Sequence, residues 1–324
     1  MANTYPISLK IEGLLAAPEV TYGTDPTPTV GVRGVGRIWG ALSPEWAFPN
    51  TREDTVSGSI IQAAPGTPKG RMVNLTYTVE LTGAGAAYKG TATIVRPPAD
   101  PLFVACGMSR THVDTGGSEK VTYALADTGH GSCTIWAYAG GKLFKISGCR
   151  GSFTWAPTAG GLGEVTFNLQ GMLTGVTEAD LASISYSAVM PPAAVGMALA
   201  IVPSGGSSWT PDVAGMSVES GQEIVRLDDV NAADGIEQFA IAAAAPRFTF
   251  TPRVVDLTTY PAYALAATRT VHTIDMTLGS VQYNRVKLDA NLAYLVKDPG
   301  GAEDNGFAAW DVEYMLRDCA IIFD

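Results

Sequence analysis

A repeated stretch constrains the fold of this chain more than any other feature of its sequence. Residues 141–173 (GKLFKISGCRGSFTWAPTAGGLGEVTFNLQGML) have the pattern of two long strands joined by a turn rich in Pro and Gly. Residues 279–316 follow the same plan, with a long strand, a turn containing Pro and two Gly, and a second strand that ends in Met-Leu. A sequence that contains its own repeat is best interpreted as two copies of one structural unit.

The composition favours strands in both copies. The 324 residues include 36 Gly and 20 Pro, which predict many turns and few long helices. Residues 164–170 alternate strictly between polar and apolar side chains, as expected for a strand with one buried and one wet face. The length suits about two domains. The sequence therefore predicts a mainly β chain of two tandem units.

Changes in composition divide the chain into four segments. Residues 1–40 show little periodicity and contain several Pro and Gly, so we expect an N-terminal arm or long loop whose removal leaves both units folded. Residues 41–176 form the first unit, residues 177–211 a linker, and residues 212–324 the second unit. One short flanking helix is expected in each unit, at residues 102–108 and 259–268.

The spacing between matched segments predicts an insertion in the first unit. Residues 71–81 match residues 247–257 at an offset of 176, whereas Met172-Leu173 matches Met315-Leu316 at an offset of 143. The first unit should therefore hold about thirty extra residues, most of them in a polar loop at 108–131. Two unrelated β domains remain the alternative, because residue identity between the halves is low.

The charge of the chain limits its partners. The formal net charge is −10, and only 16% of the residues are charged. An acidic chain is poorly suited to grip the phosphates of nucleic acid, although it can surround nucleic acid without adhering to it.

Cysteine usage and hydropathy indicate an intracellular protein. None of the four cysteines has CxxC spacing, so we expect buried thiols in a reducing compartment rather than zinc ligands. The N-terminus lacks the basic segment of a signal peptide, and the most apolar stretch, residues 188–202, is too short and too Pro-rich to span a membrane. We expect a soluble, unprocessed protein made and used in a cytoplasm.

No constellation of catalytic residues emerges from the sequence. The three histidines, His112, His130 and His272, have no recognisable catalytic partners, and no GxSxG motif occurs. We therefore assign no catalytic, cofactor-binding or metal-binding residue, and expect a structural or assembly protein rather than an enzyme. A carbohydrate-binding β-sandwich is the alternative, with binding by scattered tryptophans such as Trp46, Trp136 and Trp209.

Several motifs in sequence order resemble those of tail tube proteins from long-tailed (siphovirus-type) bacteriophages. Residues 18–29 (PEVTYGTDPTPT) resemble an N-terminal signature, Glu-x-x-Tyr-Gly-Thr followed by a Pro/Thr run. Residues 101–107 (PLFVACG) resemble the short helix of that family, and residues 141–151 (GKLFKISGCRG) its central hairpin. The spacing of Gly160, Phe167 and Gly171 also fits, so the resemblance covers about the first 175 residues.

The resemblance implies a fold and an assembly. The family unit is a small β-sandwich or half-barrel with a flanking helix. Six units form a ring whose inner wall is a β-barrel, and rings stack into a tube with an acidic lumen through which DNA passes without specific binding. Two tandem units per chain imply a trimeric, pseudo-hexameric ring. The implied partners are other copies of the chain, a tape-measure protein, and the tail terminator and distal tail proteins, in a virion assembled in the host cytoplasm without a membrane.

The resemblance also implies roles for two sets of residues. The arm would dock on the next ring through Glu19, Tyr22, Gly23, Thr24 and Asp25. The polar strand faces would line the lumen, although each residue could equally belong to an ordinary solvated sheet face. The candidates are Glu164, Thr166, Asn168, Gln170, Asp289, Asn291, Asp311 and Glu313.

The second half departs from the family pattern at one place. It reads RVKLDANL at residues 285–292, where the first half has Gly-Cys-Arg-Gly. The second unit could therefore decorate the outside of a hexameric ring instead of lining its lumen. Another phage tail, neck or decoration protein is the remaining alternative.

Overall fold

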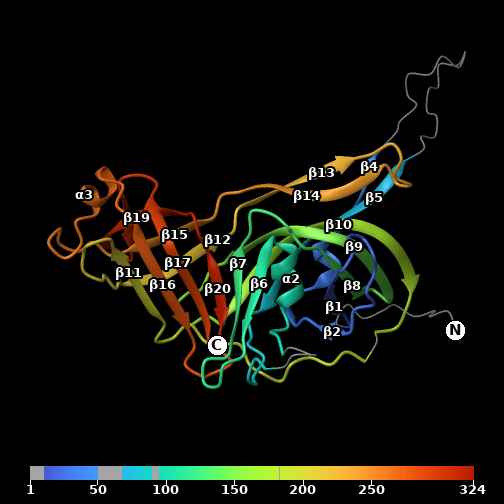
Figure 1. Cartoon of the computed structure of the whole chain (residues 1–324), viewed down its shortest axis with the longest axis horizontal. Coiled ribbons are helices and arrows are strands. Elements are labelled where there is room, and N and C mark those ends of the chain that lie inside the picture. Colours follow the sequence, from blue (N-terminus) through green and yellow to red (C-terminus); the bar gives the residue numbers. More distant parts are fainter. Residues whose placement is uncertain (1–10, 50–67, 90–94, 182) are drawn as a thin grey trace, which may run out of the picture.

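The computed structural model describes residues 11–49, 68–89, 95–181 and 183–324, and confirms a mainly β chain (Figure 1). The strands pair antiparallel throughout. The first half comprises β1 (Gly13–Pro18), β2 (Val30–Gly31), β3 (Gly34–Val35), α1 (Ile38–Ala41), β4 (Leu42–Phe48), β5 (Lys69–Glu80), α2 (Asp100–Ala105), β6 (Met108–Val113), β7 (Lys120–Leu125), β8 (Cys133–Ala139), β9 (Lys142–Trp155) and β10 (Glu164–Glu178).

The second half begins at β11 and includes the remaining helix. Its elements are β11 (Ala198–Pro203), β12 (Val213–Glu219), β13 (Gln222–Asp228), β14 (Ile236–Ala244), β15 (Arg247–Pro252), α3 (Ala262–Ala267), β16 (His272–Leu278), β17 (Val286–Leu295), β18 (Gly300–Asp304), β19 (Phe307–Leu316) and β20 (Ala320–Phe323). The short helices α2 and α3 lie where the sequence predicts one helix in each half.

The two halves share one order of strand pairing. In the first half the order is β1–β8–β9–β10–β5–β4. In the second half it is β11–β16–β17–β19–β15–β12. The helix follows the corresponding strand in each half, α2 after β5 and α3 after β15. The repeated sequence pattern therefore corresponds to a repeated arrangement of strands.

A bulge at the same place in both halves fixes which residues correspond. The β8–β9 ladder shifts register between Cys133 and Ile135, and the β16–β17 ladder shifts between His272 and Ile274. When residues are counted outward from this bulge along the paired strands, Gln170 of β10 and Met315 of β19 occupy corresponding positions in the two halves.

The matches expected from sequence are wrong in register. The sequence matches Met172-Leu173 with Met315-Leu316, and the structure displaces this match by two residues. Strict alternation cannot distinguish two registers that differ by two residues. On the neighbouring strand, Arg247 of β15 corresponds to Asn74, not to Arg71, since Asn74 pairs with Gln170 and Arg247 with Met315.

The expected insertion lies where predicted, but it is not a loop. Residues 108–131 contain β6 and β7, which pair with each other, whereas only a few residues separate α3 from β16. The other edge of β7 pairs with β20, from Phe323↔Val121 to Ala320↔Ala124. The polar residues of this segment alternate with buried ones such as Val121 and Tyr123, and that alternation is the signal of a strand.

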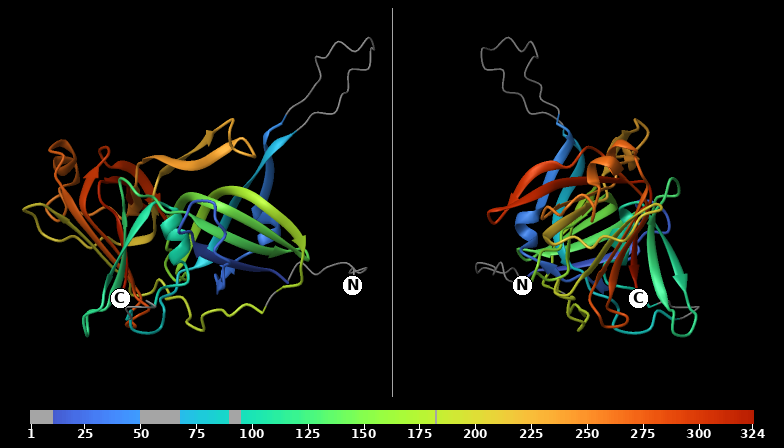
Figure 2. Two further views of the ribbon diagram at one scale, coloured as in Figure 1. Left: turned by 45° about the vertical axis from the view of Figure 1, so that its right-hand side comes forward. Right: turned by 90° about the vertical axis from the view of Figure 1, so that its left-hand side faces the viewer.

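The two halves are joined into one open sheet rather than separated by a flexible linker. Besides β7–β20, β9 pairs with β12 through Thr154↔Glu219 and Trp155↔Val218. Figure 1 shows the first half beside the second, with the β13–β14 hairpin reaching back toward β4 and β5. The left view in Figure 2 shows the same separation of the blue-to-green half from the orange-to-red half.

Strands also occur in the segments expected as arm and linker. β1 lies within residues 1–40 and β11 within residues 177–211, and both end in proline at the same place in their ladders. Leu14 and Ala16 of β1 are buried, so the short apolar run at 14–17 is an edge of the core rather than part of a free arm.

The core extends across both halves. The ring of Phe103 on α2 contacts the rings of Tyr123, Phe153, Phe167 and Phe323, which come from β7, β9, β10 and β20. All four cysteines are buried and free, as the sequence predicts. Within the described residues, no helix is long and apolar enough to cross a membrane.

Candidate functional site

The carboxylate of Glu19 organises the turn that follows β1. It accepts hydrogen bonds from the hydroxyls of Ser132 and Thr134, both at 2.6 Å, and from the backbone N–H groups of Gly23 at 2.7 Å and Gly148 at 2.8 Å. A carboxylate that accepts four hydrogen bonds is held in one position. Glu19 thereby fixes the N-terminal motif against the bulge of β9.

Tyr22 binds the same bulge from the other side. Its hydroxyl donates to the carbonyl of Gly148 at 3.1 Å and accepts from the backbone N–H of Phe239 at 2.8 Å. Burial raises the pKa of Tyr22 to about 12, so the hydroxyl stays protonated at neutral pH. Gly148 has φ +64°, and a Cβ there would lie 2.6 Å from the Tyr22 ring. Only glycine satisfies both conditions.

Arg150 extends this contact to the second half. Its guanidinium lies 5.0 Å from the centre of the Tyr22 ring and donates to the carbonyls of Phe239 at 2.7 Å, His130 at 2.9 Å and Gly131 at 3.1 Å. Burial lowers the pKa of Arg150. Glu19, Tyr22, Gly148, Arg150 and Phe239 form what we call the Glu19–Arg150 cluster.

The cluster ties the β13–β14 hairpin to the first half. Phe239 belongs to β14, and the other four members follow β1 or lie in β9. Farther along the hairpin, Arg226 donates to the carbonyl of Ala47 at 3.1 Å and lies 4.7 Å from the centre of the Phe48 ring. No sequence pattern could identify Phe239, because it contributes only backbone groups.

The remaining residues of the N-terminal motif also contact their own chain. Asp25 accepts a hydrogen bond from the indole of Trp136 at 3.0 Å and lies 3.8 Å from the ammonium of Lys145. Gly23 has φ +73°, and the N–H of Thr24 bonds the carbonyl of Thr21, which closes the turn. Docking of this motif on a neighbouring ring stays a prediction.

In the second half, a different residue accepts the hydrogen bonds from the corresponding bulge in β17. Leu292 is the counterpart of Gly148, and its N–H donates to Asp318 at 2.7 Å, as does that of Asn291 at 3.1 Å. Asp318 thus performs the role of Glu19 from the opposite side of the strand. The departure at residues 285–292 removes the tyrosine and arginine contacts but keeps a carboxylate at the bulge.

The polar residues of β10 lie on one face of the sheet with those of β5. Thr166 bonds Thr78 at 2.8 Å, and Asn168 accepts from Thr76 at 2.9 Å. Farther along the two strands the ladder pairs Glu164 with Glu80 and Gln170 with Asn74. Facing pairs in a ladder share a side of the sheet.

This polar face continues into the second half across the β9–β12 junction. Thr154 of β9 pairs with Thr166 on one side and with Glu219 on the other. From Glu219 the same side continues through the ladders of β12, β15 and β19. There Glu313 forms an ion pair with Arg247, and Asp311 accepts from Lys297 at 2.7 Å. We call these aligned polar rows, from β4 to β19, the polar sheet face.

Asp289 and Asn291 lie apart from Asp311 and Glu313, on the N-terminal part of β17. Asp289 accepts from the Asn291 amide at 2.9 Å and pairs with Asp275 of β16. Burial and the charge of Asp289 raise the pKa of Asp275, opposed by Lys287. The structure thus gathers six of the eight candidate lumen residues on β10 and β19 and leaves these two on the adjoining ladder.

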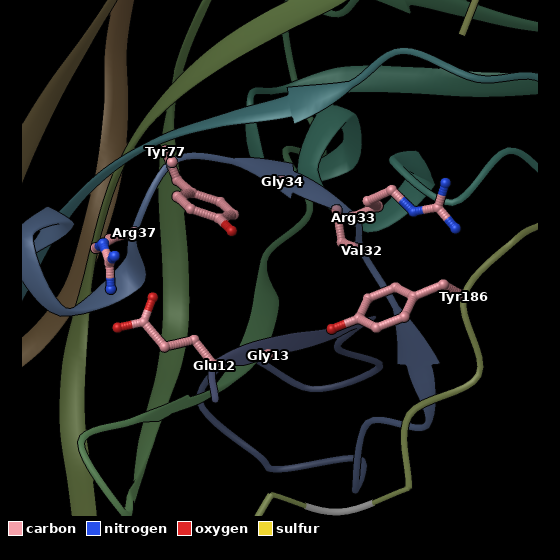
Figure 3. A pocket seen from close by; sticks show the side chains of 9 residues that line it. Glu12, Gly13, Val32, Arg33, Gly34, Arg37, Tyr77 and Tyr186 are labelled. Atoms are coloured by element: carbon pink, nitrogen blue, oxygen red, sulfur yellow. The ribbon is translucent and has the colours of Figure 1, made fainter. Parts of the chain in front are cut away.

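The hollow in Figure 3, of about 350 Å³, lies beside β1 and β3. The rings of Tyr77 and Tyr186 lie on opposite sides of it. Two of its charged groups are already engaged: Glu12 accepts from the N–H groups of Ile38 and Trp39, and Arg33 bonds the carbonyl of Ser187 at 2.9 Å. This arrangement stabilises the turn between β2 and α1 and offers no reactive pair.

The histidines have structural partners and do not meet. His112 bonds the carbonyl of Tyr88, His130 that of Ala126, and His272 lies in the core near the Tyr260 hydroxyl at 3.3 Å. Among the residues that the structure describes, no group of three His, Cys, Asp or Glu side chains is placed to hold a metal ion.

Comparison with known proteins places this architecture in a family. No curated protein sequence matches the chain. The family model described as phage tail tube protein matches residues 12–305, a range that includes the Glu19–Arg150 cluster, β5, β10 and the β9–β12 junction. Because this match extends over most of the sequence, the chain belongs to the phage tail tube protein family.

Proposed function

We propose that this chain is a non-enzymatic structural subunit of a phage tail tube, and that three chains form each pseudo-hexameric ring. Family membership implies a virion component that self-assembles into a tube and meets other tail proteins. In the proposed assembly, rings stack around a tape-measure protein, and tail terminator and distal tail proteins bind at the ends. DNA later passes through the lumen without specific binding.

The polar sheet face carries this proposal. It crosses from the first half to the second without interruption, through Thr154↔Glu219, in strands whose pairing order is the same in both halves. A single chain would then supply two adjacent sixths of an inner wall. This continuity favours a lumen lined by both halves, rather than a ring whose outside is decorated by the second half.

The charges on the polar sheet face suit a passage for DNA. The described residues contain no ion-pair partner for Glu164 or Glu219, whereas the cation of Arg247 is neutralised by Glu313. Unpaired carboxylates repel phosphate groups over about a Debye length, roughly 8 Å at physiological salt. With a chain charge of −10, such a wall would not retain DNA.

The N-terminal residues could still make contacts between rings, but from a folded turn rather than from a free arm. Glu19, Tyr22, Gly23, Thr24 and Asp25 form a rigid turn at the surface of the first half, and the segment after it, residues 26–30, is largely exposed. We propose that this turn and the exposed segment after it meet the next ring.

Electron microscopy of the purified protein tests the proposal. We expect rings or tubes with a central pore once the concentration is raised. A compact monomer at every concentration would refute the assembly role. Glycan binding that disappears on a single change such as Trp46→Ala would instead support the carbohydrate-binding alternative.

A further inference from the structure

The two corresponding helices differ in how they are covered. Leu102, Phe103 and Ala105 of α2 are buried, and α2 packs against β1, β6, β8 and β9. α3 is equally apolar (AYALAA), but Tyr263 is 46% exposed, and Ala264 and Ala267 are exposed as well. An apolar helix left open to solvent indicates a contact surface.

The ends of the two helices correspond residue by residue. α2 has its C-cap at Cys106, followed by Gly107 at φ +72°, and α3 has its C-cap at Thr268, followed by Arg269 at φ +48°. Inside the chain, the carbonyl of Cys106 accepts from the side-chain amide of Gln222 at 2.7 Å. The end of α2 in the first half thus binds the start of β13 in the second.

The counterpart of Gln222 is Trp46. Leu42 pairs with β5, Val218 pairs with β15, and their partners on those strands correspond, so Leu42 corresponds to Val218. Four residues farther along each strand, Trp46 therefore corresponds to Gln222. Gln222 is buried, whereas Trp46 is 50% exposed. Its indole N–H can donate as the amide of Gln222 does.

The surroundings of Trp46 are open where those of Gln222 are covered. Trp46 borders a hollow of about 300 Å³ with Phe144, Leu173 and Val176, the last 38% exposed. The counterpart of Val176 is Ile321, which is 1% exposed because Tyr123 of β7 pairs across from it. The first half covers this face of the second half. The same face of the first half is only partly covered, because Trp39 packs on Phe144 while Trp46 and Val176 stay exposed.

We propose that α3 of one copy docks in the Trp46 hollow of the next copy, head to tail, with Trp46 donating to the carbonyl of Thr268. This contact rests on the proposed ring and repeats one contact between the halves of a single chain, that of Gln222 with Cys106. Side chains make the contact beside the start of β4, where the N–H of Leu42 bonds Ile38 and Pro44 has no N–H to offer. Heterologous contacts close into a ring when the rotation between neighbouring copies closes.

Mixing two blocked variants tests the direction of the contact. Val176→Asp places a charge in the hollow and leaves α3 intact, whereas Ala264→Asp places a charge on α3 and leaves the hollow intact. Each variant alone should lose self-association by at least about tenfold, since burying a charged carboxylate in the contact is unfavourable. An equimolar mixture should form dimers and nothing larger, measured by mass photometry. Val230→Asp, at an exposed valine on the β13–β14 loop, is the matched control and should assemble as the unchanged chain does.

A cysteine pair tests the proposed atoms. Trp46→Cys combined with Thr268→Cys should give disulfide-linked dimers and trimers on mild oxidation of assembled protein, because the four native cysteines are buried. Val20→Cys combined with Thr268→Cys, with Val20 fully exposed, should give none above background. Circular dichroism of each variant checks that the fold is retained.

The outcomes separate this contact from the proposed function. Rings that form without the 46–268 cross-link, or variants with Val176→Asp and Ala264→Asp that assemble normally, would overturn the contact and leave the ring intact. A chain that forms no rings under any condition would remove the ring proposal itself.

Discussion

Gly148 joins two motifs that are more than a hundred residues apart in the sequence. Its N–H binds Glu19, its carbonyl binds Tyr22, and its left-handed backbone leaves room for the tyrosine ring. The Glu-x-x-Tyr-Gly-Thr signature and the Gly-Cys-Arg-Gly element are therefore two sides of one contact. Each can be recognised in the sequence, but their pairing cannot, because no local periodicity links them.

Substitution of Gly148 tests this contact. Gly148→Ala forces a side chain into a left-handed conformation and against the Tyr22 ring, so we expect a loss of about 2 kcal/mol in the free energy of unfolding. Gly175→Ala is the matched control in the same sheet, since nothing lies within 4 Å of the added Cβ. Urea denaturation measures both, and equal stability of the two variants would contradict the assigned role.

Asp275 gives a prediction for pH dependence. Because burial and Asp289 raise the pKa of Asp275 in the folded state, its ionised form costs stability at neutral pH. This loss of stability is absent below the pKa of Asp275 in the unfolded chain, about 4, and is fully present above its pKa in the folded protein. Asp275→Asn should therefore raise the Tm by about 2 °C at pH 7 and leave it unchanged at pH 3. A gain that persists at pH 3 would point to another cause.

Asp256 provides the opposite control. Hydrogen bonds from Thr258 and Thr259 lower the pKa of Asp256 to about 2. Stability from this group is present above the unfolded pKa and is lost as the pH falls toward 2. Asp256→Asn should therefore lower the Tm at pH 7, with an effect that shrinks as the pH falls through about 2. This is opposite in sign to the effect expected for Asp275→Asn at pH 7.

Among the elements, the long strands are the most predictable from sequence. Strict alternation in β10 and β5 identifies the strands and their buried and polar faces, because each buries one side. Alternation cannot distinguish registers that differ by two residues, so the match expected between β10 and β19 is displaced by two residues. The β6–β7 hairpin is missed because its polar residues outweigh the short alternating run from Val121 to Leu125.

Strand β1 changes the expected result of an N-terminal deletion. The sequence favours an arm that can be removed without loss of folding. In the structure, β1 pairs with β8 over six residues and buries Leu14 and Ala16. Removal of residues 1–36 should therefore destabilise the first half, seen as a lower Tm and lost near-ultraviolet circular dichroism. Full retention of both would show that β1 is dispensable for the fold.

At the scale of the whole molecule, two junctions make the halves one body. β7–β20 and β9–β12 join their sheets, the core ring of Phe103 contacts Phe323, and the Glu19–Arg150 cluster holds the β13–β14 hairpin. The repeated sequence pattern could predict that the two halves have similar strands. Their junctions could not be predicted, because these depend on an insertion and on backbone contacts present in only one half.

The rigid connection has a consequence for assembly. If the halves are adjacent sixths of a ring, their relative orientation already sets the angle between neighbouring units. The contact between chains then needs only to repeat that angle, and closure after three chains follows. In the proposed ring, exposed α3 and the Trp46 hollow make that contact.

Cryo-electron microscopy of assembled rings, viewed down the pore axis, tests the central claim most directly. We predict three chains per ring, six similar lobes around the pore, and β10 and β19 both facing the lumen. Six chains per ring, with β19 and the rest of the second half on the outer surface, would contradict it.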